Sequence, residues 1–304
     1  MRVMSFRHSD VDSFGVVTAA GVIDMGARLA GRYGTLRDVI AADALDTLRD
    51  MSQDYTADYS LEDITFLPPI PAPEKIICVG INYRPHIEET GREPPEYPLL
   101  FVRFPGSLTG HNEALVVPSL SHRLDYEGEL AVVIGRAGRH IPAQGALRHV
   151  AGYACVNDGS VRDYQRHTSQ FTPGKNFQSS GSFGPWLTTA DEVGDPGSLT
   201  LETRLNDNVM QSASVGDLVF DIPSLIAYVS SFAELTPGDV IVTGTPGGVG
   251  YVRKPPVYMK AGDVVEVDIS GVGVLRNRVA EEVNTLDSGS FRVDESNNEE
   301  VSEA

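Results

Sequence analysis

The chain has 304 residues, a length that allows one large domain or two smaller ones. Its 24 basic and 42 acidic side chains give a formal net charge of -18, which argues against a nucleic-acid partner and against docking on an anionic membrane. Two cysteines are too few for a disulfide framework, and the sequence shows neither a bilayer-spanning apolar run nor a secretory signal, so we expect a soluble, cytoplasmic protein.

The first 70 residues predict a small α+β domain. Short apolar runs broken by Gly and Asp indicate a small sheet in residues 1–25. Thr35 is placed to cap one helix, whose inner face would carry Leu36, Val39, Ile40 and Leu48. Residues 66–73 contain four prolines and can continue neither a helix nor a central strand. We therefore predict a boundary there, between domains of residues 1–70 and 71–286.

The second domain is rich in predicted strands. Apolar runs or clean alternation indicate strands at residues 75–80, 130–135, 151–157, 198–206, 240–242 and 264–269. Asp221 is placed to cap a helix with an inner stripe of Leu225, Ile226, Val229 and Phe232. Helices are few and do not alternate with the strands. The pattern therefore predicts a mainly β (α+β) architecture and not a doubly wound α/β sheet.

The acidity is concentrated at the end of the chain. Residues 281–304 carry eight acidic side chains and one basic one, a sum of -7. From residue 287 onward the segment has few bulky apolar side chains, so it cannot bury enough surface to offset its ordering entropy. We predict a disordered acidic tail over residues 287–304, with a partner-binding tail as the alternative.

One acidic cluster has the spacing of a cation site. Glu127 and Glu129 lead into the predicted strand 130–135, and side chains two apart on a strand point to the same face. Asp158 ends another strand. Three carboxylates without a nearby His or Cys favour a hard divalent ion such as Mg²⁺ or Mn²⁺. A solvated polar strand face explains the same spacing, whereas a two-carboxylate glycosidase explains it less well.

Three further features are chemically suggestive. His86 and Glu89 would share one helix face and form a general base, although a surface His–Glu pair fits as well. Arg162, Gln165 and Lys175 offer donors for an anionic ligand, or form an ordinary polar loop. The glycine-rich turn of residues 243–250 can offer N–H groups to a carboxylate, or serve only as a tight turn.

The two cysteines carry no such signal. Cys78 and Cys155 both lie in apolar strand runs, and the sequence has no C-x-x-C motif. We therefore predict inert core residues rather than nucleophiles.

Five motifs in this order resemble the fumarylacetoacetate hydrolase family. They read GINYRPHIEE, DYEGELAVVIG, NDGSVRDYQ, GKNF followed by GPW, and PGDVIVTGTPGGVG, and the resemblance covers roughly residues 70–282. It implies a mixed β-roll or β-sandwich catalytic domain with few helices, preceded by a small α+β N-terminal domain, and a homodimer. Gly128, between the two glutamates, and Pro85, before His86, depart from the family's usual pattern.

The resemblance also implies roles for individual residues. Glu127, Glu129 and Asp158 would hold Mg²⁺ or Mn²⁺. His86 and Glu89, on a mobile segment over the site, would activate water, with Lys175 as the third catalytic residue. The substrate would be bound by Arg162, Tyr164, Gln165, Gly244 and Thr245.

The reaction implied is hydrolysis of a C–C bond in a 2,4-diketo acid, an acylpyruvate or fumarylpyruvate, to pyruvate and a carboxylic acid. Such small anionic keto acids arise in the catabolism of aromatic or sugar-acid compounds. The nearest alternative is decarboxylation or isomerisation of oxaloacetate-like or 2-hydroxyhepta-2,4-diene-1,7-dioate-like acids on the same site. An alternative of another class is a non-catalytic metal- or ligand-binding β-sandwich module.

Overall fold

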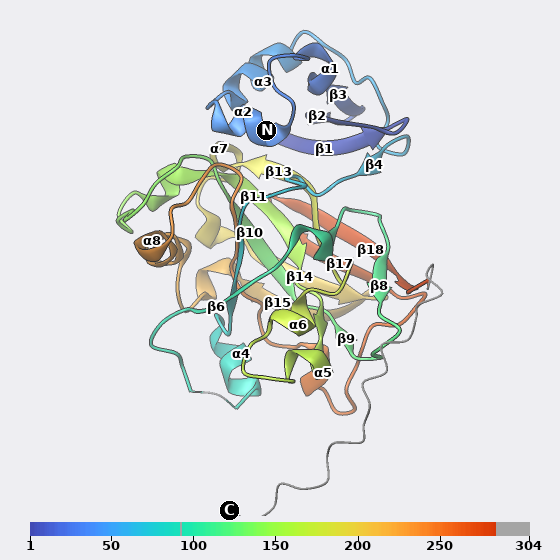
Figure 1. Cartoon of the computed structure of the whole chain (residues 1–304), viewed down its shortest axis with the longest axis vertical. Helices are drawn as coiled ribbons and strands as arrows, with labels where there is room; N and C mark the ends of the chain where they lie inside the picture. Colours follow the sequence, from blue (N-terminus) through green and yellow to red (C-terminus); the bar gives the residue numbers. More distant parts are fainter. Residues whose placement is uncertain (92, 284–304) are drawn as a thin grey trace, which may run out of the picture.

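The computed structural model describes residues 1–91 and 93–283 (Figure 1). The predicted acidic tail, residues 287–304, lies outside the described residues, as does the end of the second predicted domain. Within the described part of the chain, no helix is long and apolar enough to cross a membrane.

Two large sheets form most of the fold, which is α+β as predicted. The larger has eleven strands, in the order β3 (Gly21–Asp24), β2 (Val11–Thr18), β1 (Arg2–His8), β13 (Gly181–Thr189), β11 (Val150–Asn157), β10 (Gly128–Ile134), β16 (Val240–Val242), β5 (Ile76–Gly80) and β6 (Leu99–Val102), with β4 (Thr65–Phe66) on β1 and β7 (Leu108–Thr109) on β13. The smaller has five, in the order β15 (Asn208–Ser214), β14 (Thr200–Leu205), β17 (Val264–Ile269), β18 (Gly273–Glu281) and β8 (Leu115–Val117). Strands β9 (Leu124–Asp125) and β12 (Ser160–Val161) pair separately.

The sandwich core follows from the alternation along β10. Leu130 and Val132 point to one face and pack in a cluster with Leu201 of β14 and Val267 of β17. Ala131 and its odd-numbered neighbour Val133 point to the other face, into a cluster that includes the N-terminal helices. Successive strand residues face opposite sides, so one fully buried strand supplies both cores.

The N-terminal segment adds strands to the larger sheet. Strand β1 pairs antiparallel with β13, and β1–β3 with their helices lie at the top of Figure 1. Thr35 caps α2 (Leu36–Ala41) with a full capping box, as predicted. The prediction of one continuous helix is wrong, however, because Asp43 at φ 52° separates α2 from α3 (Leu45–Ser52). The helix α1 (Met25–Arg28) precedes them. The two-domain division stays a prediction.

The capped helix of the second half forms as α8 (Ile222–Phe232). The Asp221 side chain accepts a hydrogen bond from the backbone N–H of Ser224, as the sequence predicts. Leu225, Ile226 and Val229 are buried, but Phe232 is 55% exposed, so its place on the inner stripe is wrong. Phe232 is the last helical residue, and it lies against Tyr228 at the surface.

Short helices surround one end of the larger sheet. They are α4 (Arg84–Glu89), α5 (Arg162–Gln165) and α6 (Thr172–Lys175), which lie in the lower half of Figure 1, with α7 (Ala190–Val193) elsewhere. Single 3₁₀ turns are η1 (Pro105–Ser107), η2 (Ala146–His149), η3 (Pro196–Ser198), η4 (Val215–Asp217) and η5 (Gly250–Val252). Pro85 lies in the first turn of α4, where a missing N–H costs no helical hydrogen bond.

Candidate metal centre and active site

Three buried carboxylates meet where β10 begins and β11 ends. The two strands are antiparallel, with Gly128 opposite Asn157 and Glu129 opposite Val156, so their ends lie side by side. The backbone N–H of Asp158 donates to the carbonyl of Glu127 at 2.8 Å. As a result, Glu127, Glu129 and Asp158 offer oxygens that all lie within 4.8 Å of one another. The grouping expected from the two-residue spacing is present.

The residue between the two glutamates leaves no room for a side chain. A Cβ added at Gly128 would lie 2.0 Å from the hydroxyl oxygen of Thr203 in β14. The Gly128 N–H instead donates to Gln211, 2.9 Å away. The close approach of the smaller sheet accounts for glycine at this position.

Lys175 compensates part of the negative charge. Its Nζ donates to Glu127 Oε2 at 2.5 Å and to Asp158 Oδ2 at 2.6 Å. Burial alone would raise the pKa of Glu127, but the charges of Lys175 and Arg162 outweigh it and lower this pKa. The pKa of Glu129 is raised by burial and by the charges of Asp158 and Glu127.

This imbalance is the observation that fits a divalent cation. Glu129 makes no ion pair within the described residues, and its Oε2 accepts only the backbone N–H of Gly244 at 2.6 Å. Buried carboxylates that lack a compensating charge are held apart by repulsion unless a cation joins them. An all-oxygen set of this kind suits Mg²⁺ or Mn²⁺.

Arg103 is a residue of this centre that the sequence reasoning missed. Its Nη1 donates to Asp158 Oδ1 at 2.6 Å, and its remaining N–H groups bond Ser107, Ser180 and the carbonyl of Gly159. Arg103 is 2% exposed, and its hydrogen bond to Oδ1 fixes the orientation of the Asp158 carboxylate. The available signal was a single charge within the apolar stretch LLFVRF.

Arg162 is the third buried cation that contacts this centre. It binds Asp125 Oδ2 at 2.8 Å and Glu127 Oε1 at 2.7 Å, and Nη1 donates to the amide oxygen of Gln165. Asp125 is itself buried and accepts the N–H of Gly250. Arg162 therefore has carboxylate partners inside the protein.

The His–Glu pair forms on α4, with a partner on the glycine-rich turn. Nδ1 of His86 lies 2.7 Å from Glu89 Oε1, and Glu89 Oε2 accepts the N–H of Gly248 at 2.8 Å. His86 is 6% exposed, so the alternative of a surface pair is wrong. In a neutral imidazole that donates Nδ1–H to Glu89, Nε2 is the ring nitrogen that can accept a proton.

The glycine-rich turn serves the protein's own residues. The Gly244 N–H is bonded to Glu129, and the Thr245 hydroxyl donates to the carbonyl of Gly128 at 3.1 Å while accepting from Gln211. Gly248 adopts φ +101°, which a residue with a side chain rarely tolerates. The turn thus supports both a triad carboxylate and the His–Glu pair.

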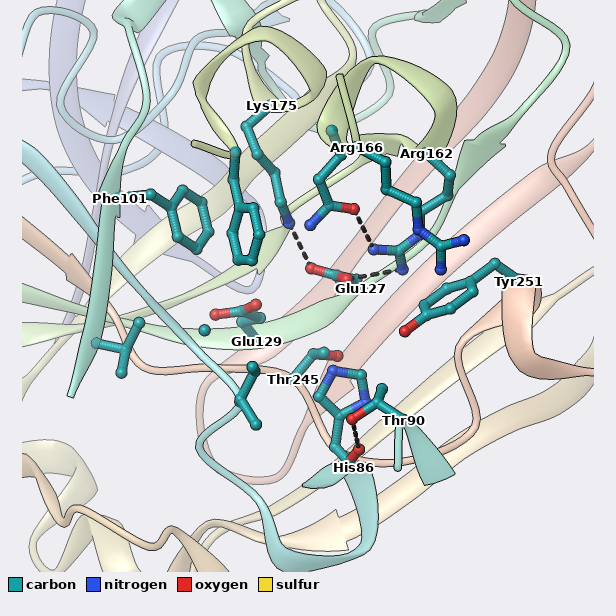
Figure 2. A pocket seen from close by; sticks show the side chains of 15 residues that line it. His86, Thr90, Phe101, Glu127, Glu129, Arg162, Arg166, Lys175, Thr245 and Tyr251 are labelled. Carbon is teal, nitrogen blue, oxygen red and sulfur yellow. Dashed lines mark hydrogen bonds and ion pairs between the residues drawn. The ribbon is translucent and has the colours of Figure 1, made fainter. Parts of the chain in front are cut away.

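These groups border one small pocket of about 60 Å³ (Figure 2). Of the predicted site residues, its walls include His86, Glu127, Glu129, Arg162, Gln165, Lys175 and Thr245. Asp158, Glu89 and Gly244 do not line the pocket, but they bond to the lining residues Lys175, His86 and Glu129, respectively. Further lining residues that the sequence reasoning did not assign include Phe101, Arg166, Phe171 and Tyr251.

Tyr164 and the cysteines lie away from the pocket wall. The Tyr164 ring packs against His167 at 4.4 Å and edge-on to Phe177 at 4.8 Å between ring centroids. Cys78 and Cys155 are free and buried, and burial raises the pKa of each thiol, as expected for inert core residues.

Residues 75–280 match the family model described as fumarylacetoacetate (FAA) hydrolase C-terminal. The chain belongs to the fumarylacetoacetate hydrolase family. It is 45% identical over 219 residues, 71% of this chain and 70% of the relative, to the Homo sapiens protein named oxaloacetate tautomerase FAHD2A, mitochondrial. The predicted family is therefore confirmed.

Solved structures of this family superpose on nearly the whole chain. Maleylpyruvate hydrolase from Sphingobium sp. SYK-6, in complex with manganese(II) ion and pyruvate, gives a TM-score of 0.77 at 30% identity and covers 93% of this chain and 100% of that one. The 5-carboxymethyl-2-hydroxymuconate delta-isomerase from Mycobacterium smegmatis gives 0.73 at 31% identity with the same coverage. The relatives thus include a tautomerase, a hydrolase and an isomerase.

Proposed function

We propose that the protein is a divalent-metal-dependent tautomerase that interconverts the keto and enol forms of a small 2-oxo dicarboxylate of the oxaloacetate class. The observation that carries the proposal is the buried imidazole of His86, paired with Glu89, which lines one small pocket together with Glu127 and Glu129 of the buried carboxylate triad. The 45% identity to a protein named oxaloacetate tautomerase supports the substrate class.

The carboxylate triad would hold the cation. Glu127, Glu129 and Asp158 would bind Mg²⁺ or Mn²⁺, and the bound ion supplies a Lewis acid that polarises a 2-oxo group. The manganese named for the similar hydrolase supports this assignment. Lys175 bonds to Glu127 and Asp158, and Arg103 bonds to Asp158. Both side chains place further positive charge beside the triad.

His86 would move the proton. Nε2 takes a proton from C3 of the keto form and returns it to the 2-oxo oxygen, which gives the enol. The substrate and product are isomers, so no water is consumed and no fragment is released. Glu89 keeps Nδ1 protonated and stabilises the imidazolium that forms during the transfer. Lys175 and Arg162 place positive charge beside the oxygen that becomes negative.

The donors on the pocket wall would position the substrate. Gln165 lines the pocket, and its oxygen is occupied by Arg162, which directs the amide N–H₂ group to a ligand. Thr245 also lines the pocket. Contacts from Gly244 and Tyr164 remain predictions, since the Gly244 N–H is bonded to Glu129 and the Tyr164 ring packs outside the wall.

Hydrolysis of a 2,4-diketo acid is the second candidate. The same Nε2 of His86 is placed to deprotonate water, whose hydroxide would add to the distal carbonyl and release pyruvate and a carboxylic acid. The similarity to a hydrolase that holds pyruvate favours this candidate. Decarboxylation of oxaloacetate would use the same polarised 2-oxo group.

The proposal also includes the expected homodimer and the expected cytoplasmic location.

One substrate panel separates these reactions. The protein would be assayed with oxaloacetate, acetylpyruvate, fumarylpyruvate and a hydroxymuconate-type acid, each with Mg²⁺ and with EDTA. We expect metal-dependent loss of the oxaloacetate enol absorbance without release of CO₂ or pyruvate. Pyruvate from acetylpyruvate would instead establish the hydrolase, and CO₂ from oxaloacetate the decarboxylase. Absence of all metal-dependent reactions would favour a non-catalytic module.

A further inference from the structure

The cations around the pocket differ in what they already bind. Lys175 bridges Glu127 and Asp158, and Arg162 bridges Asp125 and Glu127. Their charges are therefore committed to the protein's own carboxylates.

Arg166 is different. It lines the same pocket at its rim, yet it has no carboxylate within ion-pair distance anywhere in residues 1–91 and 93–283. Its guanidinium lies over the face of the Tyr251 ring, whose centroid lies 4.7 Å from the guanidinium carbon. An unpaired guanidinium retains all five N–H donors for an incoming anion.

The Tyr251 ring determines where this cation lies. The guanidinium carbon of Arg162 lies 4.4 Å from the same ring centroid, so the ring is contacted by two arginines. Figure 2 shows both guanidinium groups beside Tyr251, on the same side of the pocket. Arg166 immediately follows α5, and its backbone N–H caps that helix. Stacking and the helix end together hold the side chain at the pocket mouth.

The charge of the pocket floor shows why a further cation matters. Its buried carboxylates are Asp125, Glu127, Glu129 and Asp158, and its buried cations are Lys175, Arg162 and Arg103. The acids exceed the cations by one, so a divalent ion would leave the floor with a single positive charge. This charge balances one carboxylate of a substrate. A second carboxylate on the same ligand would have no matching positive charge in the pocket floor.

We infer that Arg166 recognises the distal carboxylate of a dianionic 2-oxo acid and so makes the pocket selective for dicarboxylates over monocarboxylates. The inference rests on the proposed function and adds the residue that reads the far end of the substrate. Arginine suits this task because its planar fork binds a carboxylate through two parallel N–H bonds.

Oxaloacetate and 2-oxobutyrate form the matched ligand pair for a test. They share the 2-oxo acid half and differ in a distal carboxylate or methyl group. The affinity of each for the Mg²⁺-loaded full chain would be measured by isothermal titration, in the wild type, Arg166→Gln and Arg166→Lys. Arg139→Gln is the control, because it removes the same charge from an exposed position outside the pocket.

We expect the wild type to bind oxaloacetate about tenfold or more tightly than 2-oxobutyrate, and Arg166→Gln to lose most of that preference. Arg166→Lys should retain part of it, and Arg139→Gln all of it. An equal loss for both ligands, an unchanged preference in Arg166→Gln, or no preference in the wild type would overturn the inference. Equilibrium binding does not require turnover. A retained preference without tautomerisation would therefore reject the proposed function alone.

Discussion

The two sides of the pocket are built in different ways. The carboxylate side is formed by the ends of two central strands, and Glu129 and Asp158 are almost fully buried there. The imidazole side depends on α4, a helix of six residues. Its C-terminal end is tied to the glycine-rich turn by the hydrogen bond between Glu89 and the N–H of Gly248.

The N-terminal end of α4 is anchored by a different group. The N-terminal end of α4 is fixed by Asn82, whose amide bonds the carbonyls of Phe220 and Thr243. The backbone of the glycine-rich turn, residues 243–250, contacts both sides, but none of the α4 contacts above is made by a triad carboxylate, so the side chains of the two sides can be changed separately. Changes on one side should leave the other side intact, and the predictions below test that separation.

The largest effect is expected from Glu129→Gln. The substitution keeps the shape of a triad residue but removes its charge, so Mg²⁺ affinity should fall more than about 100-fold and metal-dependent turnover should be lost. Titration calorimetry measures the affinity. In the metal-free state the variant should be at least as stable as the wild type, because a buried, poorly compensated carboxylate is gone. Normal Mg²⁺ binding by Glu129→Gln would remove Glu129 from the cation site.

His86→Ala should affect the other side alone. Turnover should fall by roughly 10²- to 10⁴-fold, the range of general acid–base catalysis, while Mg²⁺ affinity stays within about twofold of the wild type. Steady-state rates and calorimetry on the same preparation check both. Glu89→Gln, which retains a hydrogen-bond acceptor for Nδ1, should lose less. If His86→Ala lost metal affinity as well, the two sides would not be independent.

Arg103→Met sharpens the comparison on the carboxylate side. Removing this buried partner leaves Asp158 misoriented, so Mg²⁺ affinity should fall by about 10- to 100-fold. Breaking the buried ion pair should also cost about 3–5 kcal/mol of unfolding free energy. Arg103→Lys keeps the charge and should recover part of the metal affinity. A purely structural role for Arg103 would show as lost stability with unchanged metal affinity.

The smallest effect is a pH dependence of the metal-free protein. The pKa of Glu129 is raised above its ordinary value of 4.5 in the folded state, chiefly by burial, so above that pH the folded chain binds more protons than the unfolded chain. Stability should therefore fall as pH rises from about 4.5 through the raised pKa, by at most about 1.4 kcal/mol per pH unit. Chemical denaturation of wild type and Glu129→Gln measures the difference. Parallel pH profiles of the two proteins would contradict the raised pKa.

Strands and the triad were predictable because their signals are local. The apolar run before residue 135 and the two-residue spacing of Glu127 and Glu129 fix which face each side chain takes. The break at Asp43, which divides one expected helix in two, depends on a single left-handed residue with no Gly or Pro signal. A periodic pattern does not reveal such a break.

Contacts between segments that lie far apart in the sequence were harder to predict. Arg103 and Asp158 lie 55 residues apart in sequence, and the strands that precede them, β6 and β11, are not neighbours in the sheet, so no local pattern predicts their contact. The bond from Gly244 to Glu129 spans 115 residues, which is why the turn was expected to bind substrate and not a triad carboxylate. The order of the five motifs predicts part of these contacts, because it identifies the family, and the family implies which distant residues share one site.

Proton exchange at C3 of oxaloacetate tests the central claim most directly. The loss of the C3 proton signal in D₂O would be followed by NMR with catalytic amounts of protein and Mg²⁺. We predict that wild type accelerates the exchange, that EDTA abolishes the acceleration, and that His86→Ala loses it while still binding Mg²⁺. Acceleration that persists in His86→Ala or in EDTA would contradict the assignment of a metal-dependent proton transfer to His86.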